Sequence, residues 1–145
     1  MPLPEPVPGL VIRYSYLWHS EYLRGREEGQ KDRPCAIIAA VRSDATGLTR
    51  VLVLPLTHTP PEHPELAIEI PARVKERLGL DAERSWVIVS EWNEFAWPGP
   101  DLRRARGSDE ASVAYGMLPP NLFGTIRDRF IAFTRSRRRR VIRSE

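Results

Sequence analysis

Two apolar segments joined by a short turn constrain the fold of this chain more than any other feature. Residues 34–41 (PCAIIAAV) form a continuous apolar run of strand length, which indicates a central strand buried on both faces. Residues 49–57 (TRVLVLPLT) predict a second strand, and residues 43–47 (SDATG) between them have the composition of a turn. The two segments therefore predict a β-hairpin. We expect Pro55 at an edge or a bulge, because proline donates no hydrogen bond to a neighbouring strand.

Shorter elements are expected on either side of this hairpin. The pattern of apolar and polar residues predicts further strands at residues 10–18, 66–70 and 85–92, with a polar loop at residues 20–32. Residues 97–100 (WPGP) should end the last strand, and a loop rich in charge and glycine follows as far as Gly116.

Two helices complete the predicted fold. Residues 71–79 (PARVKERLG) predict a short helix, because proline suits the first turn and glycine ends a helix. A longer helix should begin at residues 119–120 and run through Arg135 or beyond. Its apolar side chains form one stripe that should pack on the sheet: Leu122, Ile126, Phe130 and Phe133. The predicted fold class is mainly β with α, a small curved β-barrel with a short connecting helix and a C-terminal helix.

A chain of 145 residues suits a single domain. We place its core at about residues 8–133 and treat residues 134–145 as an arginine-rich C-terminal tail. The one cysteine, Cys35, should be buried and cannot form an internal disulfide. No apolar run approaches the ~20 residues of a membrane span, and the first ten residues lack the basic start of a signal peptide. We therefore expect a cytoplasmic protein without a membrane partner.

Positive charge gathers at the C-terminal end. Residues 1–102 contain 11 basic and 15 acidic side chains, whereas residues 103–145 contain 11 basic and 4 acidic ones. Twenty of the 22 basic residues are arginine, whose planar side chain can bind phosphate through two hydrogen bonds. Six arginines lie within residues 135–143 (RSRRRRVIR). This segment is either a solvated helix end or disordered tail, or a surface that holds RNA or an acidic partner.

The sequence lacks several common catalytic motifs. The chain has no glycine-rich phosphate-binding loop and no G-x-S-x-G turn, so nucleotide hydrolases and the common serine hydrolases find no support. Glu91 and Glu94 should point to opposite faces of a strand, which is poor geometry for a paired acid and base. The histidines are His19, His58 and His63. They have neither the spacing of metal ligands nor an obvious third ligand, so we predict no metal and no cofactor.

A polar pair remains at the ends of the predicted hairpin. Arg33 begins the first strand after a polar loop (GREEGQKDRP), and Thr57 ends the second. Because antiparallel strands place the start of one beside the end of the next, these two residues should be neighbours. On spacing alone, the pair is either a surface arginine with a hydroxyl that ends a strand, or part of a functional site.

The chain resembles the PemK/MazF family of toxins from type II toxin–antitoxin systems, and in particular its PemK-like branch. Four blocks in family order carry the resemblance: residues 8–18 (PGLVIRYSYLW), 25–38 (GREEGQKDRPCAII), 51–60 (VLVLPLTHTP) and 84–91 (RSWVIVSE). The resemblance covers about residues 8–133. It implies an SH3-like barrel with a C-terminal helix, which agrees with the predicted order of elements.

The resemblance also implies an activity. Family members are ribosome-independent or ribosome-associated endoribonucleases that cut single-stranded RNA, including mRNA, without a metal, leaving a cyclic phosphate and a 5′-hydroxyl. Arg33 matches the catalytic arginine of the family and Thr57 its catalytic threonine. Glu91 falls where some members carry an acidic residue important for cleavage. Because arginine stays protonated, His58, which directly follows Thr57, is our candidate for proton transfer.

RNA contacts are expected from loop and strand-end residues. Glu27 matches the glutamate of the family's loop motif, and Arg26 stands where other members have a histidine. Lys31 and Thr59 lie within the matched blocks. Single-stranded RNA also needs aromatic surfaces for stacking, and Trp92, which has polar neighbours, is the tryptophan that we expect to be exposed.

One position departs from the family. Val89 stands where some members carry a catalytic arginine, two residues before the acidic position. Three functions therefore stay open: an RNA-cleaving toxin, a catalytically silent RNA-binding or regulatory member, and an inhibitor of a protein target of the gyrase-poisoning type. The expected partners are single-stranded RNA, a cognate antitoxin protein and a second copy of the chain in a homodimer. Operator DNA would be bound only through the antitoxin complex.

Overall fold

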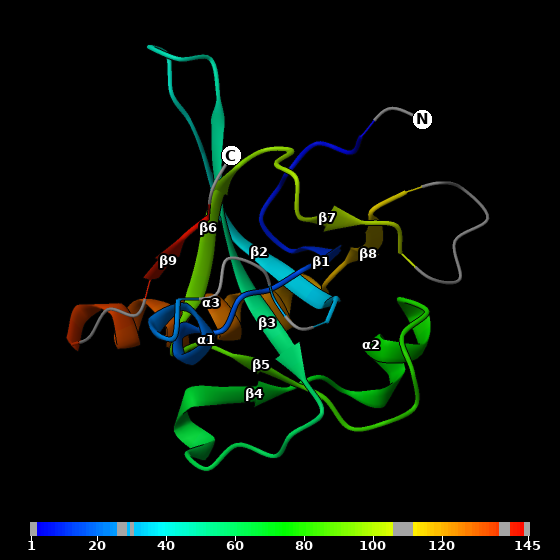
Figure 1. Cartoon of the computed structure of the whole chain (residues 1–145). Helices are drawn as coiled ribbons and strands as arrows, with labels where there is room; N and C mark the ends of the chain where they lie inside the picture. Colours follow the sequence, from blue (N-terminus) through cyan, green and yellow to red (C-terminus); the bar gives the residue numbers. More distant parts are fainter. Residues whose placement is uncertain (1–2, 26–28, 30, 106–111, 137–139, 144–145) are drawn as a thin grey trace.

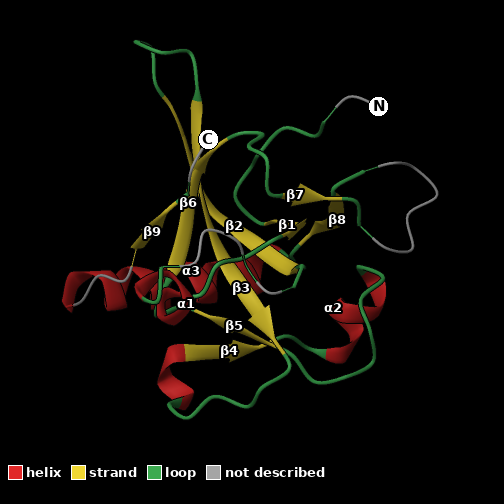
Figure 2. Ribbon diagram, in the orientation of Figure 1, coloured by secondary structure: helices red, strands yellow, loops and turns green. Residues whose placement is uncertain are grey.

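Figure 1 shows the computed structural model of the chain, which describes residues 3–25, 29, 31–105, 112–136 and 140–143. Strands predominate over helices, which are red in Figure 2. The elements follow in this order: β1 (Leu10–Tyr14), α1 (His19–Leu23), β2 (Arg33–Arg42), β3 (Thr49–Thr57), the 3-10 helix η1 (Pro64–Leu66), β4 (Ala67–Glu69), α2 (Ala72–Arg77), β5 (Trp86–Ile88), β6 (Trp92–Ala96), β7 (Leu102–Arg103), β8 (Ala114–Met117), α3 (Pro120–Ser136) and β9 (Arg140–Ile142). The predicted fold class, mainly β with α, is confirmed.

The strands form one curved, barrel-like sheet. Its main order is β4-β5-β3-β2-β1-β7, while β6 pairs with β3 and β9, and β8 pairs with β1. The long strand β3 is the centre of this arrangement. It pairs with β2 along one side, and on the other side β6 pairs with Arg50–Val53 and β5 with Leu56–Thr57. The described pairings are antiparallel, apart from the parallel pair β6 and β9.

The hairpin strands bury both of their faces, as the apolar run predicts. Along β2, Cys35 and Ile37 belong to one hydrophobic cluster, whereas Ala36 and Ile38 belong to the other. Alternate residues of a strand point to opposite faces, so this division follows directly from the sequence of the strand. The sheet is therefore covered on both sides at β2, and its ends are the places where polar side chains can reach solvent.

Helices α2 and α3 pack against one face of the sheet. In α3, the predicted apolar stripe faces the core: Ile126, Phe130 and Phe133 are buried, and Leu122 packs at the margin. Helix α2 adds Val74 and Leu78 to the same cluster. These contacts place α2 beside the ends of β2 and β3 (Figure 1). Neither these helices nor the others that the structure describes are long and apolar enough to cross a membrane.

Several predicted boundaries are wrong. The strand predicted at residues 10–18 ends at Tyr14, and α1 occupies part of the predicted loop at residues 20–32. The strand predicted at residues 85–92 is divided into β5 and β6, which pair with different parts of β3. The loop predicted to extend to Gly116 contains β7 and β8, which both pair with β1. Strands of two to four residues are too short to show an alternating pattern.

Pro55 lies in the central strand, and not at an edge as predicted. It is opposite Cys35 of β2, away from the β-bulge of that pair, which falls between Ile37 and Ala39. On its other side, β6 pairs as far as Val53 and β5 begins at Leu56. On that side, Pro55 thus lies in the gap between β6 and β5, opposite neither strand.

Part of the C-terminal segment belongs to the sheet. Strand β9 runs parallel to β6, and Val141 is fully buried. Arg143, which follows β9, is also buried and donates a hydrogen bond to the backbone oxygen of Ser15. Residues 140–143 are therefore part of the folded domain. Residues 137–139 of the arginine run lie outside the described residues.

Candidate active site

A pocket at the ends of β2 and β3 brings together four of the predicted site residues. It has a volume of about 760 Å³ and is lined by Lys31, Arg33, Thr57 and His58, with Lys75 and Asp81 on the facing wall. The antiparallel register of β2 and β3 places the start of one strand beside the end of the other, as predicted. Lys75 belongs to α2 and Asp81 to the loop that follows it; Figure 1 shows α2 beside the end of β3.

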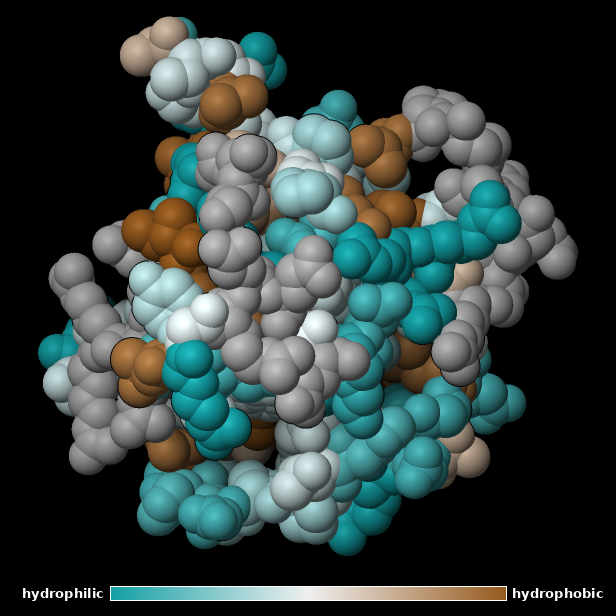
Figure 3. Space-filling model, in the orientation of Figure 1, coloured by the Kyte–Doolittle hydropathy of each residue, from teal (hydrophilic) through white to brown (hydrophobic). Residues whose placement is uncertain are grey.

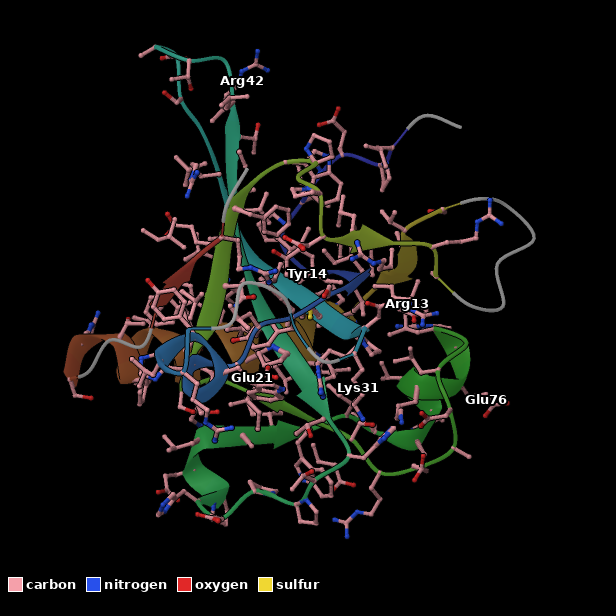
Figure 4. The ribbon with its side chains drawn as sticks, viewed as in Figure 1. Arg13, Tyr14, Glu21, Lys31, Arg42 and Glu76 are labelled. Atoms are coloured by element: carbon pink, nitrogen blue, oxygen red, sulfur yellow. The ribbon has the colours of Figure 1, made fainter. Side chains whose placement is uncertain are left out.

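The surroundings of the pocket are strongly polar. Figure 4 shows Arg13 and Lys31 on the side of the molecule where α2 lies. Figure 3 shows that this region is mainly hydrophilic on the face in view. Asp32 lies 3.7 Å from Nη2 of Arg13 and 3.6 Å from Nε of Arg103, so it neutralises part of the positive charge at one edge. A cationic pocket of this kind suits a phosphate-containing ligand.

Arg33 is half-buried and held in a fixed position. Its Nη1 donates a hydrogen bond to the backbone oxygen of Leu56 at 3.3 Å, and its guanidinium carbon lies 4.9 Å from the ring centre of Trp18. Burial lowers the pKa of Arg33 below its ordinary value, while nearby groups such as Glu21 oppose this change. The guanidinium stays protonated at neutral pH. Its buried Nε has no hydrogen-bond partner among the described residues. Arg33 lines the pocket, where the outer nitrogens of a guanidinium can donate to a phosphate oxygen.

Thr57 presents a hydroxyl group at the end of β3. Its Oγ1 accepts a hydrogen bond from the backbone N–H of Thr59 at 3.1 Å, which fixes the turn after the strand. A hydroxyl that accepts one bond can still donate its own hydrogen. Thr59 is exposed and lies outside the lining of this pocket, so its predicted contact with RNA remains a prediction.

His58 is held by a carboxylate. Its Nε2 lies 2.9 Å from Oδ2 and 3.1 Å from Oδ1 of Asp81, and its Nδ1 lies 3.7 Å from Oε2 of Glu83. One imidazole and two carboxylates, with donor atoms within 4.8 Å of one another, could ligate a divalent cation. However, the ammonium group of Lys75 already contacts Oδ1 of Asp81 at 2.6 Å. We therefore assign no metal to this cluster.

Lys75 carries a buried ammonium group at the wall of the pocket. It donates to Oδ1 of Asp81 and to Oγ of Ser85, each at 2.6 Å, and also to the backbone oxygen of Glu83. An ammonium group has three hydrogens, so these three acceptors satisfy it completely. A buried charge is tolerated only when it is paired and hydrogen-bonded in this way.

Glu91 lies outside the pocket. Its Oε1 accepts hydrogen bonds from the Tyr16 hydroxyl at 3.1 Å and from the backbone N–H of His19 at 2.9 Å. It therefore fixes the segment that carries Trp18, and it reaches Arg33 only through the longer-range effect of its charge. The carboxylate does not line the pocket.

The expectation that Trp92 is exposed is wrong. Its side chain is 5% exposed and packs edge-on against Phe130 of α3, with ring centres 5.1 Å apart. A buried ring has no free face for a base. Val89, at the position of the family arginine, is fully buried in the core, so nothing there replaces that arginine. Arg26 and Glu27 lie outside the described residues.

Sequence reasoning missed several residues that shape the pocket. The ring of Trp18 lies against the guanidinium of Arg33, although the two residues are fifteen positions apart. In the sequence, only its place near the end of a predicted strand marked Trp18. Lys75 and Asp81 come from α2 and the loop after it, whereas Arg13 comes from β1. One signal was present: a lysine in a helix that otherwise buries Val74 and Leu78 is unusual at a buried position.

The comparisons with known proteins leave the site to be interpreted from its own geometry. Neither a protein-family model, nor a curated protein, nor a solved structure matches this chain significantly.

The ion pair between Lys75 and Asp81 should make the free energy of unfolding depend on pH in the acid range. Burial tends to raise the pKa of Asp81, but its hydrogen bond to Lys75 and the charges of Lys75 and His58 outweigh this and hold the pKa below its ordinary value of 3.8. A carboxyl with a lowered pKa stabilises the fold above that value, and this contribution is lost as the pH falls below it.

We therefore expect the parent protein to lose more unfolding free energy between pH 7 and pH 3 than an Asp81→Asn variant does. The difference should be under about 1 kcal/mol, because half of the Asp81 side chain is exposed. Urea denaturation at the two pH values measures it. Equal losses in the two proteins would show that the pair does not stabilise the fold.

Proposed function

We propose that this protein is a cytoplasmic, metal-independent endoribonuclease that cleaves single-stranded RNA through the RNA's own 2′-hydroxyl, acting as the toxin of a toxin–antitoxin pair. The observation that carries the proposal is Arg33, a half-buried guanidinium that lines the pocket and is held by the backbone oxygen of Leu56. It shares a pocket with a hydroxyl, on Thr57, and an imidazole, on His58. The resemblance to PemK/MazF toxins at Arg33 and Thr57 supports the same function.

The reaction breaks one bond and forms one. The 2′-oxygen attacks phosphorus, the new O2′–P bond closes a cyclic phosphate, and the P–O5′ bond breaks. A base takes the 2′-hydroxyl proton, and the leaving 5′-oxygen gains a proton to become a 5′-hydroxyl. Arg33 is suited to stabilise the negative charge that grows on the phosphate oxygens, an effect worth ~10²–10³ in rate for one preorganised donor. Thr57, which hardly ionises, is suited to orient the reacting oxygens.

Binding of the RNA backbone fits the other side chains of the pocket. Lys31 is exposed, and Arg13 lines the same space. Cations at these positions suit the phosphates on either side of the one that reacts, because each phosphate that is neutralised releases a counterion. Recognition of the bases would determine the sequence that is cut.

A second candidate function is a catalytically silent RNA-binding member of the same family. Val89 favours it, since this position is a core position here and cannot supply the arginine that some family members use. The two candidates differ in one outcome: the silent member binds RNA and leaves it intact.

The proposal is tested by incubating the purified protein with long single-stranded RNA in EDTA and mapping the ends. We expect cuts that carry 5′-hydroxyl ends, and an Arg33→Ala variant that binds the RNA without cutting it. Binding without any cleavage by the parent protein would favour the silent member. The absence of both binding and cleavage would favour a protein target and contradict the proposal.

Trp18 should act as a positioning residue for Arg33. Replacing it with leucine removes the cation–π contact, which is worth ~0.5–2 kcal/mol, so we expect the cleavage rate at saturating RNA to fall about tenfold. A Trp18→Phe variant keeps a ring face under the guanidinium and should retain most of the rate. Thermal unfolding of both variants checks that they fold. A Trp18→Leu protein that folds and cleaves at the parental rate would show that the contact has no role.

The arginine run offers a separate prediction on RNA binding. Deleting everything after Thr134 would also remove β9 and Arg143, so substitution is the cleaner change. Replacing Arg137, Arg138 and Arg139 with glutamine should weaken RNA binding and flatten its dependence on salt, because fewer counterions are released. Binding titrations at several salt concentrations measure this slope. An unchanged slope would assign the run no part in RNA binding.

Protein partners complete the proposal. A toxin of this kind would form a homodimer and would be neutralised by a cognate antitoxin, with operator DNA bound only by the toxin–antitoxin complex. Exposed apolar side chains provide surface for such contacts at Val41 and Leu48 of the β2–β3 hairpin and at Ile142 of β9.

A further inference from the structure

A chain of three polar side chains runs from the inside of the fold to the pocket. The Lys75 ammonium is 4% exposed and contacts Oδ1 of Asp81, and the carboxylate of Asp81 contacts Nε2 of His58. All three residues line the pocket that also contains Arg33 and Thr57. We propose that Asp81, itself fixed by Lys75, positions His58 to act as the general base of RNA cleavage. This inference rests on the proposed endoribonuclease function.

The carboxylate selects which nitrogen of His58 is available. A carboxylate only accepts hydrogen bonds, so Nε2, which lies 2.9 Å from Oδ2 of Asp81, carries a hydrogen. In the neutral ring, Nδ1 then has the lone pair and is the nitrogen that can take a proton. Glu83 is 3.7 Å from Nδ1, beyond hydrogen-bond distance, so it does not occupy that nitrogen.

Asp81 is held from two directions. Its Oδ1 accepts hydrogen bonds from Lys75 and from the backbone N–H of Glu83, at 2.6 Å and 3.1 Å. Lys75 cannot turn away without losing bonds, because Ser85 and the backbone oxygen of Glu83 hold its other hydrogens. An exposed imidazole and carboxylate on their own would form a weak surface pair. The buried ammonium is what gives this carboxylate one orientation.

One proton moves to His58 during cleavage, and one proton from water reaches the leaving oxygen. The 2′-hydroxyl gives its proton to Nδ1 of His58 while the 2′-oxygen bonds to phosphorus. The P–O5′ bond breaks, and the 5′-oxygen takes a proton from water. The resulting imidazolium has Asp81 against its Nε2–H, and it returns the proton to water after the products leave. The charged groups that face His58 are Asp81 and Glu83 from the loop, with Lys75 of α2 behind Asp81.

The test compares four variants in single-turnover cleavage at saturating RNA: His58→Ala, Asp81→Asn, Glu65→Gln and the double variant His58→Ala/Asp81→Asn. Loss of a general base costs ~10²–10⁴ in rate, so His58→Ala should fall in that range and lose the dependence of the rate on pH near neutrality. Asp81→Asn should lower the rate by about 10²-fold through misplacement of the base, with RNA affinity unchanged. Glu65→Gln, which removes a carboxylate 3.7 Å from Nδ1 of His63 outside the pocket, should cleave like the parent.

The double variant separates positioning from a general effect on structure. Because Asp81 acts through His58, the double variant should lose no more of the cleavage rate than His58→Ala alone. A folded Asp81→Asn protein that cleaves at the parental rate, or losses that multiply in the double variant, would overturn the inference while leaving the proposed function intact. A parent protein that binds RNA and never cuts it would overturn both. Lys75→Met, if it folds, should reproduce the Asp81→Asn loss in rate.

Discussion

Replacing Arg33 with alanine is expected to lower the rate of RNA cleavage by about 10²–10³, the usual effect of one preorganised donor to the reacting oxygens. The side chain is already oriented by the backbone oxygen of Leu56 and the ring of Trp18, so it needs no rearrangement when charge develops on the phosphate. Losing these two contacts should cost about 1 kcal/mol each at most, and the variant should remain folded. Single-turnover cleavage and urea denaturation measure the two effects.

Two further variants sharpen this prediction. Arg33→Lys keeps the charge and loses the planar fork, so most of the activity should disappear although RNA still binds. Arg84 offers a matched control outside the pocket, since its guanidinium also lies over a tryptophan, 5.0 Å from the ring centre of Trp86. Arg84→Ala should cleave like the parent. A parental rate in folded Arg33→Ala would refute the assignment of Arg33 as a catalytic residue.

Replacing Arg143 with alanine should lower the free energy of unfolding by about 3–5 kcal/mol, the cost of breaking a buried ion pair from one side. The guanidinium donates to the backbone oxygen of Ser15 at 2.8 Å and to Oδ1 of Asn93 at 3.0 Å. It also lies 3.1 Å from the carboxylate of Asp101, which is itself buried. Without Arg143, the Asp101 charge would lose this partner inside the protein.

Urea denaturation of Arg143→Ala measures this loss. Arg135, which is exposed in the last turn of α3, provides the control, and Arg135→Ala should change the free energy of unfolding by no more than ~0.5 kcal/mol. Equal, small changes in the two variants would show that residues 140–143 do not stabilise the domain. A large loss for Arg143 alone would establish that the arginine-rich segment contains a structural residue.

The parts of the fold that follow from local sequence were predictable. The apolar run and the turn after it gave the β2–β3 hairpin, and the end of β3 at Thr57 is as predicted. The helical stripe gave α3. Strand β9 was not predictable, because a run of arginines has no apolar periodicity and Arg143 is buried only through partners from three distant segments. Likewise, Trp92 has polar neighbours in sequence and yet packs on Phe130, a contact that only the tertiary fold creates.

Part of the candidate site also follows from local sequence, and part depends on tertiary packing. Arg33 and Thr57 come together because antiparallel pairing alone places them side by side, and this depends only on the hairpin. Lys75 and Asp81 reach the pocket because Val74 and Leu78 pack α2 onto the core beside the ends of the hairpin. That placement depends on how the helix packs, and neither residue belongs to a motif that could reveal it. Lys75 and Asp81, the two residues that position His58 in the proposed chain, were therefore not predicted from the sequence.

Cleavage of an RNA that carries a single 2′-deoxynucleotide tests the central claim most directly. The position to substitute is the nucleotide on the 5′ side of a mapped cut, in an otherwise unchanged single strand, with EDTA present. If the RNA's own 2′-hydroxyl is the nucleophile in the Arg33 pocket, the parent protein will bind this RNA with unchanged affinity and leave it intact at the substituted position, while cutting the all-ribose strand. Cleavage at the 2′-deoxy position would mean that another nucleophile attacks phosphorus, and it would contradict the account.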